Sequence, residues 1–110
     1  MNGPGKNPYG AALLSALATV ALAEQQPLSL VVTGDAFSPS ELQAPSGIKL
    51  QVAVTNQTRG AIEFESFELN RERVIQAGQT VTVYLSPLDP GRYEFFDDFH
   101  QERRGTLVVK

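Results

Sequence analysis

The residues best suited to chemistry lie in one charged stretch near the end of the chain. The segment Tyr93–Gly105 reads YEFFDDFHQERRG and holds the only histidine of the protein. Carboxylate oxygens and an imidazole are ligands that hard and borderline metal ions accept. If the protein has a chemical site, we expect it here, around His100 and its acidic neighbours Asp97, Asp98 and Glu102.

The elements on either side predict that this stretch is a hairpin connection. Residues 86–91 read SPLDPG, a turn in which the prolines preset φ and the glycine accepts a positive φ. Thr106–Lys110 is rich in β-branched residues and predicts a final strand. A polar loop held between two strands is rigidly mounted, and binding residues are often placed in such loops.

The first 23 residues are predicted to be a secretory signal peptide. A turn-rich start with one lysine precedes the apolar run 11–22, which is too short to cross a bilayer because a spanning helix needs about 20 residues. Ala21, Leu22 and Ala23 fit the small-x-small cleavage pattern. An amphipathic helix kept in the mature protein is disfavoured because the run has no polar face. We therefore expect a mature domain of residues 24–110 in the periplasm.

Composition restricts the function classes. The chain has no cysteine, which excludes disulfides, thiolate metal ligands and a cysteine nucleophile. Loss of residues 1–23 would leave eight Lys and Arg against twelve Asp and Glu, a net charge of −4. An acidic exported domain is a poor partner for nucleic acid. Neither phosphate-loop glycines nor a serine near the histidine is present, so we expect no organic cofactor and no enzymatic activity.

Short alternating segments predict a single all-β domain. The clearest is Ile48–Thr55, where apolar side chains at every second position face one way. Ser38 and Glu41 have the spacing of a capping box and predict at most one helical turn. Five to seven strands without a long helical segment predict a Greek-key β-sandwich or barrel. Further strands are predicted at residues 28–33, 61–65 and 80–85.

Several motifs together resemble a cupredoxin-like domain over essentially the whole mature chain. They are Asn56, the acid-flanked residues 62–67, Gly78, the LDPGRYEF of residues 88–95, His100 and the RGTLVV of residues 104–109. In blue-copper members of that family the hairpin reads C-x-x-H-x-x-M followed by R-G.

The resemblance implies which positions correspond to copper ligands. The cysteine position falls on Asp97, the histidine on His100 and the methionine on Arg103, while the first histidine falls near Glu63. Only one of the four ligands is retained. Blue-copper electron transfer needs a copper–thiolate bond, so the lack of cysteine excludes it.

Carboxylates and one imidazole remain around the same pocket, and such a set suits iron, manganese or a non-blue Cu(II). The Glu63-Phe64-Glu65 motif with a cysteine-free hairpin resembles the cupredoxin-like proteins associated with bacterial high-affinity iron permeases. That resemblance implies an iron or copper ion as ligand. It also implies a membrane iron permease, or another periplasmic iron-uptake component, as partner. The candidate metal ligands are Glu63, Glu65, Asp97, Asp98, His100 and Glu102.

A metal-free interaction domain is the alternative. If Arg103 or Arg104 pairs with Asp97 or Glu63, the acids are neutralised and the hairpin serves to dock a basic protein surface. Convergence of Glu63, Asp97 and His100 on one point would instead favour the metal site.

Two further interpretations remain open at this stage. Glu63 and Glu65 also fit the solvated side of an amphipathic strand, where charges protect an edge against aggregation. Oxidation of Fe(II) by bound copper is disfavoured because one histidine is few for a redox copper site. A second acidic site at Glu68 and Glu72 is not decided by the sequence.

Overall fold

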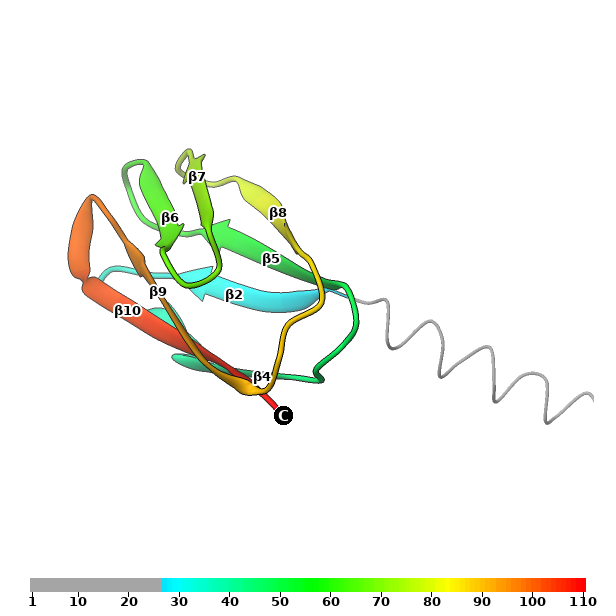
Figure 1. Ribbon diagram of the computed structural model, residues 1–110. Coiled ribbons are helices and arrows are strands. Elements are labelled where there is room, and N and C mark those ends of the chain that lie inside the picture. The colour runs from blue at the N-terminus through cyan, green and yellow to red at the C-terminus, as the bar shows by residue number, and fades with distance from the viewer. Residues whose placement is uncertain (1–26) are drawn as a thin grey trace, which may run out of the picture.

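Two β-sheets pack face to face in the computed structural model, which describes residues 27–110 (Figure 1). One sheet has the order β3-β2-β5-β8, formed by Phe37–Ser38, Leu28–Val32, Leu50–Asn56 and Thr80–Leu85. The other has the order β4-β10-β9-β6-β7, formed by Glu41–Ala44, His100–Val109, Gly91–Asp97, Ile62–Ser66 and Arg71–Ile75. The prediction of an all-β sandwich is confirmed.

Strict alternation of side chains builds the core between the sheets. Every second residue of β5 is buried, as the sequence pattern predicted. Phe37 from the first sheet meets Phe64 and Phe95 from the second, with ring centroids 6.3 and 5.0 Å away, both edge-to-face. Edge-to-face packing is favourable because the positive ring edge meets the negative ring face. These ring contacts join the two sheets beneath β6 and β9.

The predicted helical turn at Ser38–Glu41 is wrong. Residues on both sides are strands: β3 pairs with β2, and β4 pairs in parallel with β10 through Glu41 and Thr106. In β4 the side chains of Leu42 and Ala44 are buried while the two others are exposed. Burial against the sheet therefore overrides the local capping-box spacing.

The stretch expected to be a loop is mostly strand. β9 runs to Asp97 and β10 begins at His100, so only two residues turn the chain. The pairing then shifts, because His100 is opposite Asp97 while Arg104 is opposite Phe96. This irregularity holds three extra residues on β10 and changes the direction of the side chains within it.

Beyond the irregularity, β9 and β10 approach closely at Gly105. A Cβ atom there would lie 2.5 Å from two ring atoms of Phe95 and 3.0 Å from the carbonyl oxygen of Ser40. Only glycine fits this position without displacing the core ring.

The predicted signal peptide, residues 1–23, lies outside the described residues. Within residues 27–110 no helix is long and apolar enough to span a membrane.

Candidate metal centre

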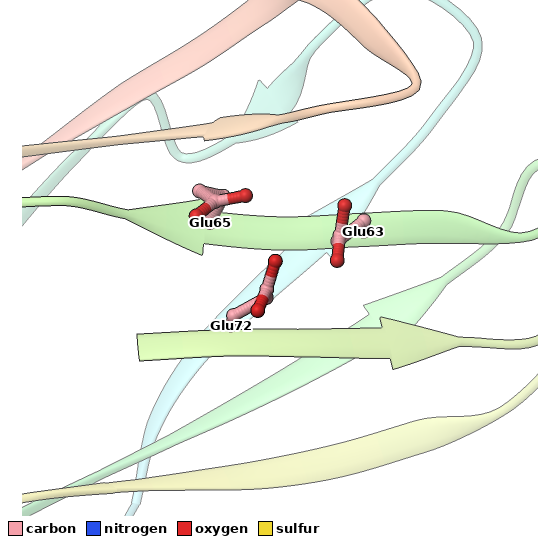
Figure 2. Close-up of side chains that lie close together, drawn as sticks. All are labelled: Glu63, Glu65 and Glu72. Atoms are coloured by element: carbon pink, nitrogen blue, oxygen red, sulfur yellow. The ribbon is translucent and has the colours of Figure 1, made fainter. Parts of the chain in front are cut away.

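Three glutamates meet on the outer face of the five-stranded sheet (Figure 2). Burial of Ile62 and Phe64 turns Glu63 and Glu65 of β6 outward. The antiparallel register sets Glu72 of β7 directly opposite Glu65. One carboxylate oxygen from each glutamate lies within 4.8 Å of the others. We call Glu63, Glu65 and Glu72 the carboxylate cluster.

The cluster concentrates negative charge, and no basic side chain of residues 27–110 pairs with it. Partial burial and the hydrogen bond and repulsion from Glu72 raise the pKa of Glu63 to about 7, with smaller contributions from Glu65 and Asp98. Burial also raises the pKa of Glu65, again with repulsion from Glu72 and Asp98. Within residues 27–110 no Lys, Arg or His side chain lies within 4.0 Å of the three carboxylates. A proton or a cation would therefore relieve repulsion that nothing else in this part of the chain offsets.

Asp98 lies at the border of the carboxylate cluster. Its backbone N–H donates to the Glu63 carbonyl oxygen at 2.8 Å, which brings the β9–β10 turn against β6. Its Oδ1 accepts a hydrogen bond from Gln101 Nε2 at 2.9 Å. Its carboxylate raises the pKa of Glu63 and of Glu65, less than burial and Glu72 do.

Asp97 forms a buried ion pair with Arg103. Its side chain is fully buried, and Oδ2 accepts a hydrogen bond from Arg103 Nη1 at 2.9 Å. Oδ1 accepts the backbone N–H groups of Glu63 and Phe99, each at 3.0 Å. Arg103 also donates from Nε to the Gly34 carbonyl oxygen at 2.9 Å. The positions where the family resemblance implied a cysteine and a methionine thus hold a carboxylate and a guanidinium that bind each other.

The predicted convergence of Glu63, Asp97 and His100 is not formed. In the described part of the chain, no three ligand atoms within 4.8 Å of one another include Asp97, His100 or Glu102. His100 Nδ1 lies 3.6 Å from Asp97 Oδ2 on a half-exposed ring, and Glu102 is exposed. Of the six candidates, the structure therefore places Glu63 and Glu65 in the group of close ligand atoms, leaves Asp98 beside that group, and leaves the other three apart.

Glu72 is the cluster member that the ligand prediction missed. β7 is an edge strand with three consecutive exposed residues, so its sequence has no clear alternation. The connection between β6 and β7 is short, and Asn70 within it has a φ of 55°. Asparagine tolerates the left-handed region, which marks a tight turn. Pairing Ser66 with Arg71 across this turn sets Glu72 opposite Glu65.

Comparison with known proteins identifies the domain. Residues 9–109 match the family described as "Cupredoxin-like domain". An uncharacterized protein of Rickettsia prowazekii (strain Madrid E), RP394, is 31% identical over 83 residues, which are 74% of this chain. The chain spans 66% of the length of that relative.

Solved structures agree on the fold. The purple cupredoxin from Nitrosopumilus maritimus superposes with a TM-score of 0.62 at 18% identity, covering 76% of this chain and 99% of that one. Amicyanin from Paracoccus versutus gives a TM-score of 0.61 at 14% identity, with 77% and 82% covered. The reduced Cu(I) form of an amicyanin variant gives 0.63 at 15% identity, with 78% and 84% covered. This chain belongs to the cupredoxin-like domain family.

Proposed function

We propose that this protein binds a hard or borderline metal ion, iron first and non-blue copper second, at the carboxylate cluster. The observation that carries the proposal is the placement of three carboxylates on adjacent strands with oxygen atoms within 4.8 Å and no basic partner among residues 27–110. Like charges directly opposite each other destabilise a sheet. A cation held between Glu63, Glu65 and Glu72 would turn that repulsion into attraction.

The donor set determines which ions fit. Three carboxylates and the nearby Asp98 offer only oxygen atoms, which suit hard ions such as Fe(III) and Mn(II). The chain has no cysteine, so a blue-copper centre is excluded. A non-blue Cu(II) site usually includes imidazole, and the single His100 lies with Asp97 rather than in the cluster. This chemistry ranks iron above copper.

We further propose that the protein works in the periplasm and delivers its ion to a membrane iron-uptake system. The leader-like residues 1–23 and the resemblance to iron-permease-associated proteins support this role. Delivery requires ligands that a receiving protein can reach. Glu63 and Glu65 are partly exposed and Glu72 is exposed, so a partner's ligands could replace them one at a time.

The second candidate is a metal-free domain whose acidic hairpin docks a partner. The Arg103–Asp97 pair favours it, because one hairpin acid is already neutralised by an arginine. Asp98 and Glu102 stay exposed on the same hairpin and would provide its negative charge.

Calorimetric titration separates the two candidates. Residues 24–110 are titrated with Fe(II) under anaerobic conditions, Fe(III) citrate, Cu(II) and Mn(II). We expect a saturable one-to-one isotherm for iron that Glu65→Gln or Glu72→Gln weakens by roughly tenfold or more, about 1.4 kcal/mol. Glu102→Gln is the matched control, since it removes the same charge from an exposed acid outside the cluster.

The possible outcomes are distinct. Affinity lost with His100→Ala but kept in Glu65→Gln and Glu72→Gln would move the site to the hairpin. The absence of any heat of binding with all four ions would reject metal binding and favour the docking module.

A further inference from the structure

A large hydrophobic side chain stands exposed at the tip of the β6–β7 hairpin. Phe67 is 76% exposed, the highest value among the exposed large hydrophobic residues of the described chain. Its ring meets Phe96 of β9 at a centroid distance of 5.4 Å and an interplanar angle of 68°. Phe96 itself is buried. We call the Phe67 and Phe96 rings the apolar ledge. Only the Phe67 ring is accessible to a partner.

Two hollows share Phe67 in their lining. The first, of about 370 Å³, is lined by Phe67, Glu68, Glu94, Phe96, Gln101 and Arg104. The second, of about 350 Å³, is lined by Glu65, Ser66, Phe67, Asn70, Arg71 and Glu72. Since Phe67 lines both, a side chain that enters either hollow contacts its ring.

Hydrogen bonds hold this hairpin tip in place beneath Phe67. Ser66 Oγ donates to the Glu94 carbonyl oxygen at 2.5 Å and accepts the Leu69 N–H at 3.1 Å. The Glu68 carboxylate accepts the Glu94 N–H at 2.7 Å. Leu69 is buried. The exposure of Phe67 is therefore fixed by an anchored turn, and a preformed surface loses less conformational entropy on binding.

Negative charge surrounds the ledge. Four acids line the two hollows, Glu65, Glu68, Glu72 and Glu94, against two arginines. The Arg71 guanidinium donates to the backbone carbonyls of Tyr84, Leu69 and Asn70. Arg104 lies over the Phe96 ring at 5.0 Å and 4.0 Å from Glu94. A second copy of this face would bring acids against acids, whereas a basic partner would meet opposite charge.

We propose that the outer face around Phe67 docks a basic segment of a partner protein. An apolar side chain of that segment enters a hollow beside Phe67, and flanking Lys or Arg side chains pair with Glu65, Glu68, Glu72 and Glu94. An exposed aromatic anchor inside a ring of polar groups is the arrangement that concentrates binding energy in protein interfaces. The inference goes beyond the proposed function, since it requires no metal and centres on Phe67 of the β6–β7 hairpin. It shares Glu65 and Glu72 with the carboxylate cluster, and β9 and β10 contribute Glu94, Phe96, Gln101 and Arg104 to its surface.

The test uses a defined probe and a matched control variant. The ¹⁵N-labelled protein, with EDTA present, is titrated with a nine-residue peptide of alternating lysine and leucine around a central phenylalanine, and with the same peptide carrying glutamate for lysine. We expect amide shifts centred on Phe67, Phe96 and Arg104 with the lysine peptide alone. Phe67→Ser should weaken binding by roughly tenfold, the effect of a residue worth more than 1 kcal/mol. Tyr84→Ser is the control, because Tyr84 is 63% exposed on β8 of the other sheet and should not matter.

Each remaining outcome overturns the proposal. Absence of shifts, shifts centred on the β9–β10 turn, or equal binding by the Phe67→Ser protein would remove Phe67 as the anchor. Shifts that depend on protein concentration without peptide would show self-association of this face instead.

Discussion

Replacing Arg103 by methionine should strongly destabilise the domain, because it leaves a fully buried carboxylate without its cation. Asp97 has no exposed surface, and Arg103 is its charged hydrogen-bond partner at 2.9 Å. Methionine keeps much of the side-chain length but removes both the charge and the donor. The backbone carbonyl of Gly34 also loses the hydrogen bond from Arg103 Nε.

The size of the effect follows from burial. Removing one partner of a buried ion pair costs about 3–5 kcal/mol, because the remaining charge stays away from water. Asp97 keeps the N–H groups of Glu63 and Phe99, which limit the loss to the lower half of that range, about 3 to 4 kcal/mol. Small domains have an unfolding free energy of about 5–15 kcal/mol, so this is a large fraction.

Urea denaturation of the wild type and the variant at pH 7 measures the difference. Arg104→Met is the matched control: it makes the same change at the next residue, where the side chain is half exposed and its partner Glu94 is 4.0 Å away. An exposed pair contributes about 0–1 kcal/mol, so Arg104→Met should remain close to the wild type. Equal, small losses in the two variants would refute the reasoning that Asp97 depends on Arg103.

Three further predictions concern the carboxylate cluster and the β9–β10 contact. Because the folded pKa of Glu63 is about 7 and its ordinary value is 4.5, the contribution of this group to stability is fully present below pH 4.5 and is lost as the pH rises to about 7. Glu72→Gln should lower the pKa of Glu63 towards 4.5, measured by ¹³C NMR titration of the side-chain carboxylate; an unchanged titration would contradict the assigned repulsion. Gly105→Ala should destabilise the domain by about 1–3 kcal/mol, since its Cβ would lie 2.5 Å from the ring of Phe95. Gly60→Ala, with nothing within 4 Å, should change the unfolding free energy by less than about 1 kcal/mol, and equal thermal shifts would contradict the overpacking.

The strands with strict alternation could be predicted from the sequence, because each depends only on its own residues. β8 covers Thr80–Leu85 as predicted, whereas β5 begins two residues after its predicted start and ends one residue beyond its predicted end. β4 could not be predicted, since its burial comes from pairing with β10, a segment more than 50 residues away. The early start of β10 was hidden for a related reason, because polar residues from His100 to Arg104 carry no strand periodicity.

The candidate site was predicted in part. The resemblance to iron-linked cupredoxins named Glu63 and Glu65, and the structure places both in the carboxylate cluster. The resemblance could not reveal that the pairing shifts after His100 and that Arg103 is buried, where its guanidinium forms an ion pair with Asp97. Nor could an edge strand without alternation reveal Glu72. Each miss depends on cross-strand register, which local patterns do not contain.

Paramagnetic broadening by Mn(II) tests the location of the metal site most directly. Substoichiometric Mn(II) is added to the ¹⁵N-labelled protein at pH 7.5, above the raised pKa of Glu63, so that the carboxylates are free to bind. The carboxylate cluster predicts that amide signals disappear first around Glu63, Glu65 and Glu72, and that Glu72→Gln restores them. Broadening centred on His100 and Glu102, unchanged by Glu72→Gln, would contradict it.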